Sequence, residues 1–152
     1  NTIHNHLGGR PPVCDLQREM DLASLIQGAN VESLIGSAHD LSDGGLAQAL
    51  AECVVRFGIG ARVWLNEICE RDAVDATNAL FSESTGRVLV SVPREDDVKF
   101  LGLCEAREFP VLRIGVTDGS GADARLEIQD QFTVSVADIR EASNATLPKY
   151  FG

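Results

Sequence analysis

Apolar residues recur at helical spacing in the segment that begins at residue 44. These positions are Leu46, Ala49, Leu50, Cys53 and Val54. Because they fall on one face at about 3.6 residues per turn, we predict an amphipathic helix over residues 44–57. A short apolar run over residues 37–41 precedes it and predicts a strand. Ser42 or Asp43 is the expected N-cap between the two elements.

Helical and strand patterns alternate along the rest of the chain. Further helices are predicted over residues 15–26, 72–80, 95–107 and 136–142, with a helical turn at 31–34. Further strands are predicted over residues 61–65, 88–92, 111–116, 125–128 and 132–134. This order predicts an α/β (α+β) sandwich, a mixed β-sheet flanked by helices. The continuous apolar run at 88–92 indicates a central strand covered on both faces. The segment Asp-Gly-Ser-Gly at 118–121 is predicted to be a hairpin connection.

The length and composition fit one domain with a substantial core, since 44% of the 152 residues are hydrophobic. Residues 1–13 contain Gly8-Gly9 and Pro11-Pro12 and are predicted to be an interdomain linker, which leaves 14–152 as the domain. The chain begins without Met, so we expect it to be part of a larger polypeptide. Its four cysteines are widely spaced, which argues against disulfides or a zinc framework and favours the cytoplasm.

The net charge narrows the range of partners. Against 23 acidic residues there are 13 basic ones, for a net charge of −10. This balance argues against nucleic-acid binding, which needs a basic surface, and against a domain that alone holds a multiply phosphorylated ligand. We expect no membrane association, because no apolar run approaches spanning length and no signal peptide is visible.

The first candidate site lies where the strand at 37–41 meets the following helix. Gly44 and Gly45 leave the first N–H groups of the helix unshielded, which suits either a bound anion or close packing of the backbone. Asp40 and Asp43 would repel a naked phosphate and suit a magnesium-bridged phosphate or a neutral group better. His39 could act as an acid–base group or be structural.

The second candidate site is the run Ser82-Glu83-Ser84-Thr85-Gly86-Arg87. Glu83 could hold a ligand hydroxyl or amine, and Arg87 could pair with a phosphate or carboxylate. The alternative is a Glu83–Arg87 ion pair with serine caps and a positive-φ turn at Gly86. His4 and His6 are too few for a closed metal site, so no metal site is predicted.

Three segments resemble one enzyme family. Residues 39–47, HDLSDGGLA, are similar to the HDxSDGGLA motif of phosphoribosylformylglycinamidine synthases, and residues 80–90, LFSESTGRVLV, to their LFSESxGRxLV segment. Residues 3–12 resemble the joint before the last domain of those enzymes. The resemblance implies an AIR synthase-related, PurM-like C-terminal domain in an ATP-dependent ligase of purine biosynthesis. Its partners would be the other domains of the polypeptide, a glutaminase subunit, a small accessory subunit and a phosphorylated ribonucleotide substrate.

The same resemblance implies which residues face a ligand cleft. The candidates are Asp40, Ser42, Asp43, Gly44, Gly45, Ser82, Glu83, Ser84, Gly86 and Arg87. ATP and Mg²⁺ would lie mainly in other domains, so no residue here is predicted to be catalytic and the isolated domain is expected to be inactive. Two alternatives stay open: another superfamily member, of selenophosphate synthetase or thiamine-phosphate kinase type, and a non-catalytic scaffold that docks a partner subunit.

Overall fold

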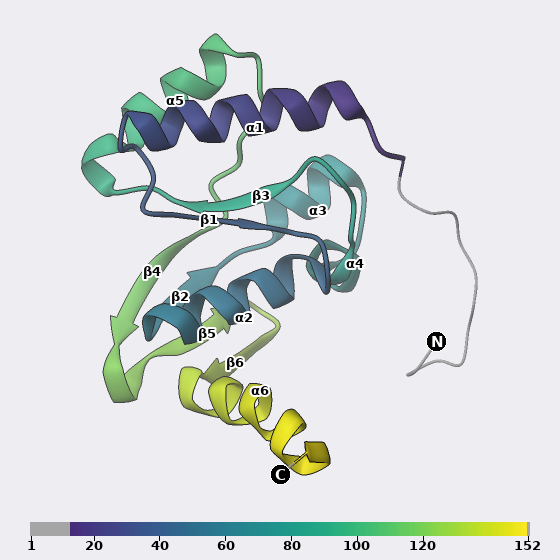
Figure 1. Ribbon diagram of the computed structural model, residues 1–152, viewed down its shortest axis with the longest axis vertical. Coiled ribbons are helices and arrows are strands. Elements are labelled where there is room, and N and C mark those ends of the chain that lie inside the picture. The colour runs from purple at the N-terminus through teal and green to yellow at the C-terminus, as the bar shows by residue number, and fades with distance from the viewer. Residues whose placement is uncertain (1–12, 152) are drawn as a thin grey trace.

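The computed structural model describes residues 13–151, with side chains as far as residue 145 (Figure 1). The predicted linker therefore lies outside the described residues except at Val13. The helices are α1 (Leu16–Val31), α2 (Gly45–Phe57), α3 (Asn66–Asp72), α4 (Ala76–Phe81), α5 (Asp97–Ala106) and α6 (Val136–Phe151). The strands are β1 (Ser37–Asp40), β2 (Ile59–Val63), β3 (Val88–Ser91), β4 (Gly115–Ser120), β5 (Arg125–Ile128) and β6 (Phe132–Ser135). This content confirms the predicted α/β class.

The strands form two sheets rather than the single mixed sheet that the sequence predicted. β1 and β3 make an antiparallel ribbon, with Ala38 opposite Val90 and His39 opposite Leu89. The other sheet has the order β4-β2-β5-β6 and is mixed, because β2 runs antiparallel to β4 and parallel to β5. β5 and β6 lie where the last two strands were predicted and pair antiparallel as a hairpin.

The ribbon separates two hydrophobic cores. In Figure 1, α1 and α5 lie over one side of the ribbon, and α2 lies between the ribbon and the four-stranded sheet. Leu89 packs against the larger core around α2, whereas Val90 and Val92 pack against the smaller core of α1 and α5. The prediction that residues 88–92 are covered on both faces is therefore confirmed. The prediction of a central strand is wrong, because β3 pairs with β1 alone among the described strands.

Helix α2 contacts both sheets as well as α4 and α6. Its predicted apolar face is confirmed, with Leu46, Ala49, Leu50 and Val54 buried, while Cys53 is half-buried. The helix ends at Gly58, whose left-handed conformation (φ 64°) allows its N–H to bond the Val54 carbonyl. The larger core is therefore assembled around one short helix.

Three predicted helices differ in length or number from those observed. The helix expected at 72–80 is two helices, because Ala73 ends α3 in a left-handed conformation and Asp75 then caps α4 through the Asn78 N–H. Helix α1 continues to Val31, so the separate turn expected at 31–34 is wrong. Helix α6 also extends well past the predicted end at residue 142.

The strand expected at 111–116 is displaced toward the C-terminus. β4 begins at Gly115 and runs through Asp118 to Ser120. It lies on the opposite side of β2 from β5, so the segment 118–121 is not the predicted hairpin connection. β2 itself begins at Ile59, two residues before the predicted start. The choice of neighbour in the sheet is a long-range property that the local pattern does not contain.

The beginning of α2 packs directly against the backbone at the end of α4. Gly45 has a φ of 63°, and a Cβ there would lie 2.7 Å from the Ser82 carbonyl oxygen and 2.8 Å from that of Leu80. Both facts exclude a side chain at this position. Of the two explanations that the sequence left open for Gly45, the structure supports close backbone packing.

Gly45→Ala tests this contact. We expect the free energy of unfolding to fall by about 2 kcal/mol or more, because the substitution combines a strained φ with a backbone clash. The matched control is Gly102→Ala in α5, where a Cβ meets nothing within 4 Å. That change should raise stability by about 0.5–1 kcal/mol through helix propensity. Urea denaturation of both variants measures the difference, and equal effects would contradict the packing argument.

Candidate functional site

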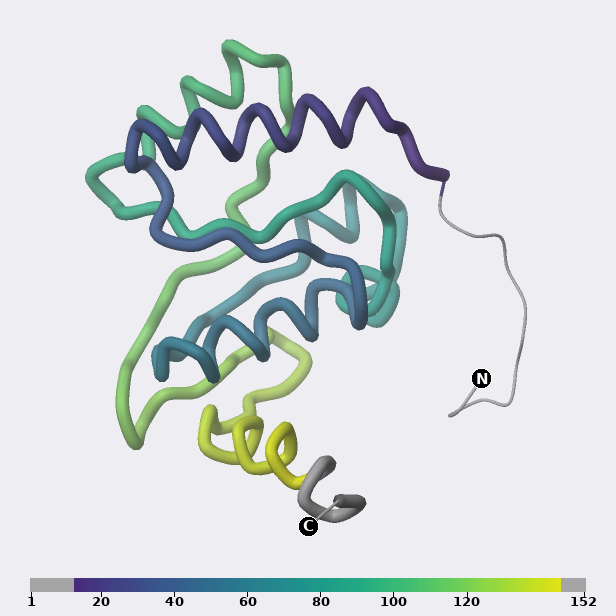
Figure 2. The backbone as a smooth tube through the Cα atoms, in the orientation of Figure 1, coloured from purple at the N-terminus to yellow at the C-terminus, as the bar shows by residue number. Residues whose placement is uncertain are grey.

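The two candidate segments meet at the N-terminus of α2. The Gly44 N–H donates a hydrogen bond of 2.8 Å to Oε1 of Glu83, which is 39 residues away in the chain. Figure 2 shows the turn from β1 into α2 beside the segment that joins α4 to β3. The predicted caps Ser42 and Asp43 are wrong, because Gly44 is the N-cap residue and no side chain of its own segment caps the helix. Ser42 instead donates its hydroxyl proton to the Asp40 carboxylate.

His39 sits in an acidic environment at the end of β1. Its Nε2 lies 2.9 Å from Oε2 of Glu52, and its Nδ1 lies 2.6 Å from the Asp40 carbonyl oxygen. The bond to the Asp40 backbone and then the bond to Glu52 raise the pKa of His39 above its ordinary value. The hydroxyl of Ser42 lowers the pKa of the exposed Asp40 carboxyl. Through its bond to Glu52, His39 links β1 to α2, so its hydrogen bonds support a structural role.

Arg87 stabilises the loop from Ser82 to Gly86. Its Nε donates to the Ser84 carbonyl at 3.3 Å, and its Nη2 donates to the Ser82 carbonyl. Gly86 has the predicted positive φ, at 69°. The alternative of a Glu83–Arg87 ion pair is wrong, because Glu83 caps α2 and Arg87 binds backbone carbonyls. Burial lowers the pKa of the half-buried Arg87 guanidinium.

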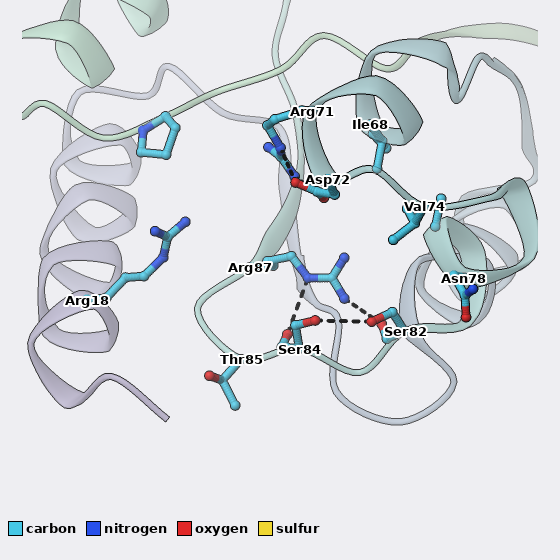
Figure 3. Close-up of a pocket in the computed structure, with 12 residues that line it drawn as sticks. Arg18, Ile68, Arg71, Asp72, Val74, Asn78, Ser82, Ser84, Thr85 and Arg87 are labelled. Carbon is cyan, nitrogen blue, oxygen red and sulfur yellow. Dashed lines mark hydrogen bonds and ion pairs between the residues drawn. The ribbon is translucent and has the colours of Figure 1, made fainter. Parts of the chain in front are cut away.

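A cavity of about 530 Å³ lies between this loop, α1 and α3 (Figure 3). Among the predicted site residues, Ser82, Ser84 and Arg87 line it. The other predicted residues lie outside its lining: Asp40, Ser42, Asp43, Gly44, Gly45, Glu83 and Gly86. The structure therefore divides the predicted site into a capped corner at the start of α2 and a separate cavity behind the loop.

Sequence reasoning missed two arginines that line this cavity. Arg18 comes from α1 and Arg71 from the last turn of α3. Arg71 forms a two-point pair with Asp72, with both N–O distances at 2.7 Å. Neither arginine belongs to a motif, and only the packing of three separate elements brings them near Arg87, so no local signal could have identified them.

The part of the chain that the structure describes holds no cluster of three His, Cys, Asp or Glu side chains suited to a metal ion. His4 and His6 lie outside the described residues. Within the same part, no helix is both long and apolar enough to cross a membrane.

Comparison with known families identifies the domain type. Residues 3–126 match the family described as AIR synthase related protein, C-terminal domain. The chain belongs to this family. It is 62% identical over 152 residues to the phosphoribosylformylglycinamidine synthase subunit PurL of Leifsonia xyli, and 52% identical over 151 residues to that of Renibacterium salmoninarum. Each alignment covers 99% of this chain but only 20% and 19% of the respective relative, so the chain spans about a fifth of their length.

Solved structures confirm the fold. Thermotoga maritima PurL complexed with FGAR matches 85% of this chain and 22% of its own at a TM-score of 0.71, with 23% identity. Escherichia coli HypE, a hydrogenase maturation protein, matches 75% of this chain and 38% of its own at a TM-score of 0.55, with 19% identity. The predicted PurM-like C-terminal domain fold is thereby confirmed. The alternatives of selenophosphate synthetase or thiamine-phosphate kinase type are not favoured by these relatives.

The long-range cap of α2 can be tested with Glu83→Ala. Losing the acceptor of the Gly44 N–H should lower the free energy of unfolding by about 1 kcal/mol, a typical loss for a helix cap. Asp43→Ala is the control, because Asp43 is exposed and has no hydrogen bond or ion pair with a described residue. Chemical denaturation measures both variants, and an equal loss from Asp43→Ala would refute the assignment of the cap to Glu83.

His39 should make stability depend on pH. Because its pKa is raised in the folded state, the stabilisation by protonated His39 is complete below its ordinary value of 6.5 and is lost as pH rises through the higher folded pKa. The stability advantage of the natural protein over His39→Gln should therefore shrink as the pH rises above the ordinary histidine pKa of 6.5. Glu52→Gln should retain part of this dependence, since the bond to the Asp40 carbonyl remains. A pH-independent difference in unfolding free energy would contradict the prediction.

Proposed function

We propose that this chain is the C-terminal domain of a longer phosphoribosylformylglycinamidine synthase, in which it forms one wall of a ligand cleft. The observation that carries the proposal is the bond from Gly44 to Glu83, because it joins the two segments that the family resemblance assigns to one cleft. The identity of 62% to a PurL relative supports this enzyme over other ligases. The whole enzyme would convert formylglycinamide ribonucleotide, ATP and glutamine-derived ammonia into the amidine, ADP and phosphate.

In this reaction ATP phosphorylates the formyl amide oxygen of the substrate, and ammonia then displaces the phosphate. The residues of this chain bind and orient rather than react. Ser42 and Asp43 are exposed in the turn that leads into the capped corner and can form hydrogen bonds with a ligand held by the neighbouring domain. ATP and Mg²⁺ would be bound mainly by the other domains.

The proposal includes partner subunits. A solved complex named PurLQS from Thermotoga maritima matches 84% of this chain at a TM-score of 0.70, which supports assembly with further subunits. We infer that these are a glutaminase and a small accessory protein. An enzyme of this kind would act in the cytoplasm, and free thiols at Cys14, Cys53, Cys69 and Cys104 suit that reducing compartment.

The competing function is a scaffold that docks the glutaminase and contacts no small ligand. The choice of nitrogen source separates the two. A domain that only docks the glutaminase is needed when glutamine supplies the ammonia, and it is dispensable when ammonium chloride does. A domain that lines the cleft is needed with both.

We predict that the double variant Ser42→Ala and Asp43→Asn, made in the full-length enzyme, lowers kcat/KM by about tenfold or more with either nitrogen source. Loss of two hydrogen bonds to a ligand is sufficient for this effect. Asp130→Asn is the control. It removes the same charge as Asp43→Asn, and Asp130 lies in the exposed turn between β5 and β6. Activity lost with glutamine but kept with ammonium would favour the scaffold, and unchanged activity with both would overturn the cleft wall.

A further inference from the structure

The cavity behind the loop at residues 82–87 concentrates positive charge in an acidic protein. Arg18, Arg71 and Arg87 line it, and Asp72 is the one acidic residue among the described residues of its lining. Three guanidinium groups against one carboxylate give the lining a net charge of about +2, whereas the whole chain carries −10. Figure 3 shows Arg18 on α1, Arg71 and Asp72 at the end of α3, and Arg87 on the loop side with its guanidinium directed toward Ser82.

Part of this donor capacity is unused. The Arg18 guanidinium has no hydrogen bond or ion pair with any residue of the described range and lies over the Phe109 ring, 5.4 Å from its centroid. Its side chain also lies against Gly86, where a Cβ would be 3.1 Å from the Arg18 Cδ atom. Arg87 uses Nε and Nη2 to hold the loop, and its Nη1 donates to no described residue. Guanidinium groups with free N–H donors are suited to phosphate oxygens.

The size and the remaining lining indicate what the anion is attached to. A volume of about 530 Å³ is much larger than one phosphate group and falls in the range of small-molecule sites. Ile68, Val74 and Ala79 supply an apolar wall, and the Ser84 hydroxyl supplies a further polar group. A net charge near +2 matches a dianion better than a carboxylate with a single charge.

We propose that this cavity binds a phosphate monoester, with its dianionic group held by the arginines of the lining and its organic part against the apolar wall. Asp72 competes with the ligand, because its carboxylate already occupies Arg71 through a two-point pair. The inference rests on the proposed function for the assignment of residues 82–87 to a ligand cleft. It goes further in assigning a phosphate site to this separate cavity and in adding two arginines from outside the family motifs.

The test is titration calorimetry on the 152-residue chain at low ionic strength, with inorganic phosphate and phenyl phosphate as probes and chloride at matched ionic strength. We expect saturable binding of both probes and tighter binding of phenyl phosphate. Arg18→Gln should weaken both by about tenfold or more, the loss typical of a charged hydrogen bond. Arg62→Gln is the control, since Arg62 makes the same charge change outside the cavity, where it pairs with Asp118 and Glu127.

A second pair of variants changes affinity in the opposite direction. Asp72→Asn frees Arg71 and should tighten binding of both probes, whereas Asp118→Asn, with the same charge change outside the cavity, should leave it unaltered. Absence of saturable binding to the natural chain would overturn the inference, as would equal effects from the two arginine variants or from the two aspartate variants. Binding of inorganic phosphate alone would overturn the monoester assignment.

These outcomes are separable from those for the proposed function. Titration of the 152-residue chain reports on the cavity without any ligase activity, and the double variant Ser42→Ala and Asp43→Asn reports on the cleft in the full-length enzyme, because neither residue lines the cavity. Suppose that phosphate binding depends on Arg18 but the ligase kinetics of that double variant are unchanged. The phosphate site in the cavity would then be supported, and the proposal that this domain forms a cleft wall would be rejected. If phosphate does not bind but the double variant loses ligase activity, the phosphate site would be rejected and the cleft-wall proposal would be supported.

Discussion

The close approach of Gly45 to the backbone at Leu80 and Ser82 is the constraint on which the rest of the structure depends. It fixes the position where α2 begins, and α2 is the helix that contacts both sheets. It also holds the loop after α4 within reach of the Gly44 N–H, so that Glu83 can cap the helix. This contact between backbone atoms therefore links the larger core to the two segments that carry the family motifs, residues 39–47 and 80–90. Of the glycine pair at the start of the helix, Gly45 is explained by this packing, and Gly44 is the left-handed N-cap whose N–H binds Glu83.

Local patterns in the sequence predicted most of the elements, and the errors have a common cause. The apolar face of α2, the strand at β1 and the hairpin of β5 and β6 all follow from the residues within each segment. The break between α3 and α4 depends on the left-handed conformation of Ala73, a residue that carries no turn signal. The pairing of β2 with both β4 and β5 is set by tertiary packing, so the sequence pattern gave one sheet where the protein has two.

The candidate site likewise has features that the local sequence predicted and others that depend on long-range packing. The residue types and the turn at Gly86 could be predicted, because glycine and the polar run mark them locally. The partners could not, since Glu83 bonds to a residue 39 positions away and Arg87 bonds to carbonyls of its own loop. The cavity joins α1, α3 and the 82–87 loop. Its positive lining could not be read from a chain whose overall charge is strongly negative.

The ribbon of β1 and β3 also has a consequence for dynamics. Its two faces contact different cores, so the layer of α1 and α5 is attached to the rest of the molecule chiefly through one small apolar cluster around Leu25, Phe100 and Cys104. A layer held in this way can open as a cooperative unit while the core around α2 stays folded. Arg18 belongs to the layer that opens, and Arg87 belongs to the part that remains. We therefore expect that, if this layer opens first, the wall of the cavity that carries Arg18 separates from the wall that carries Arg87.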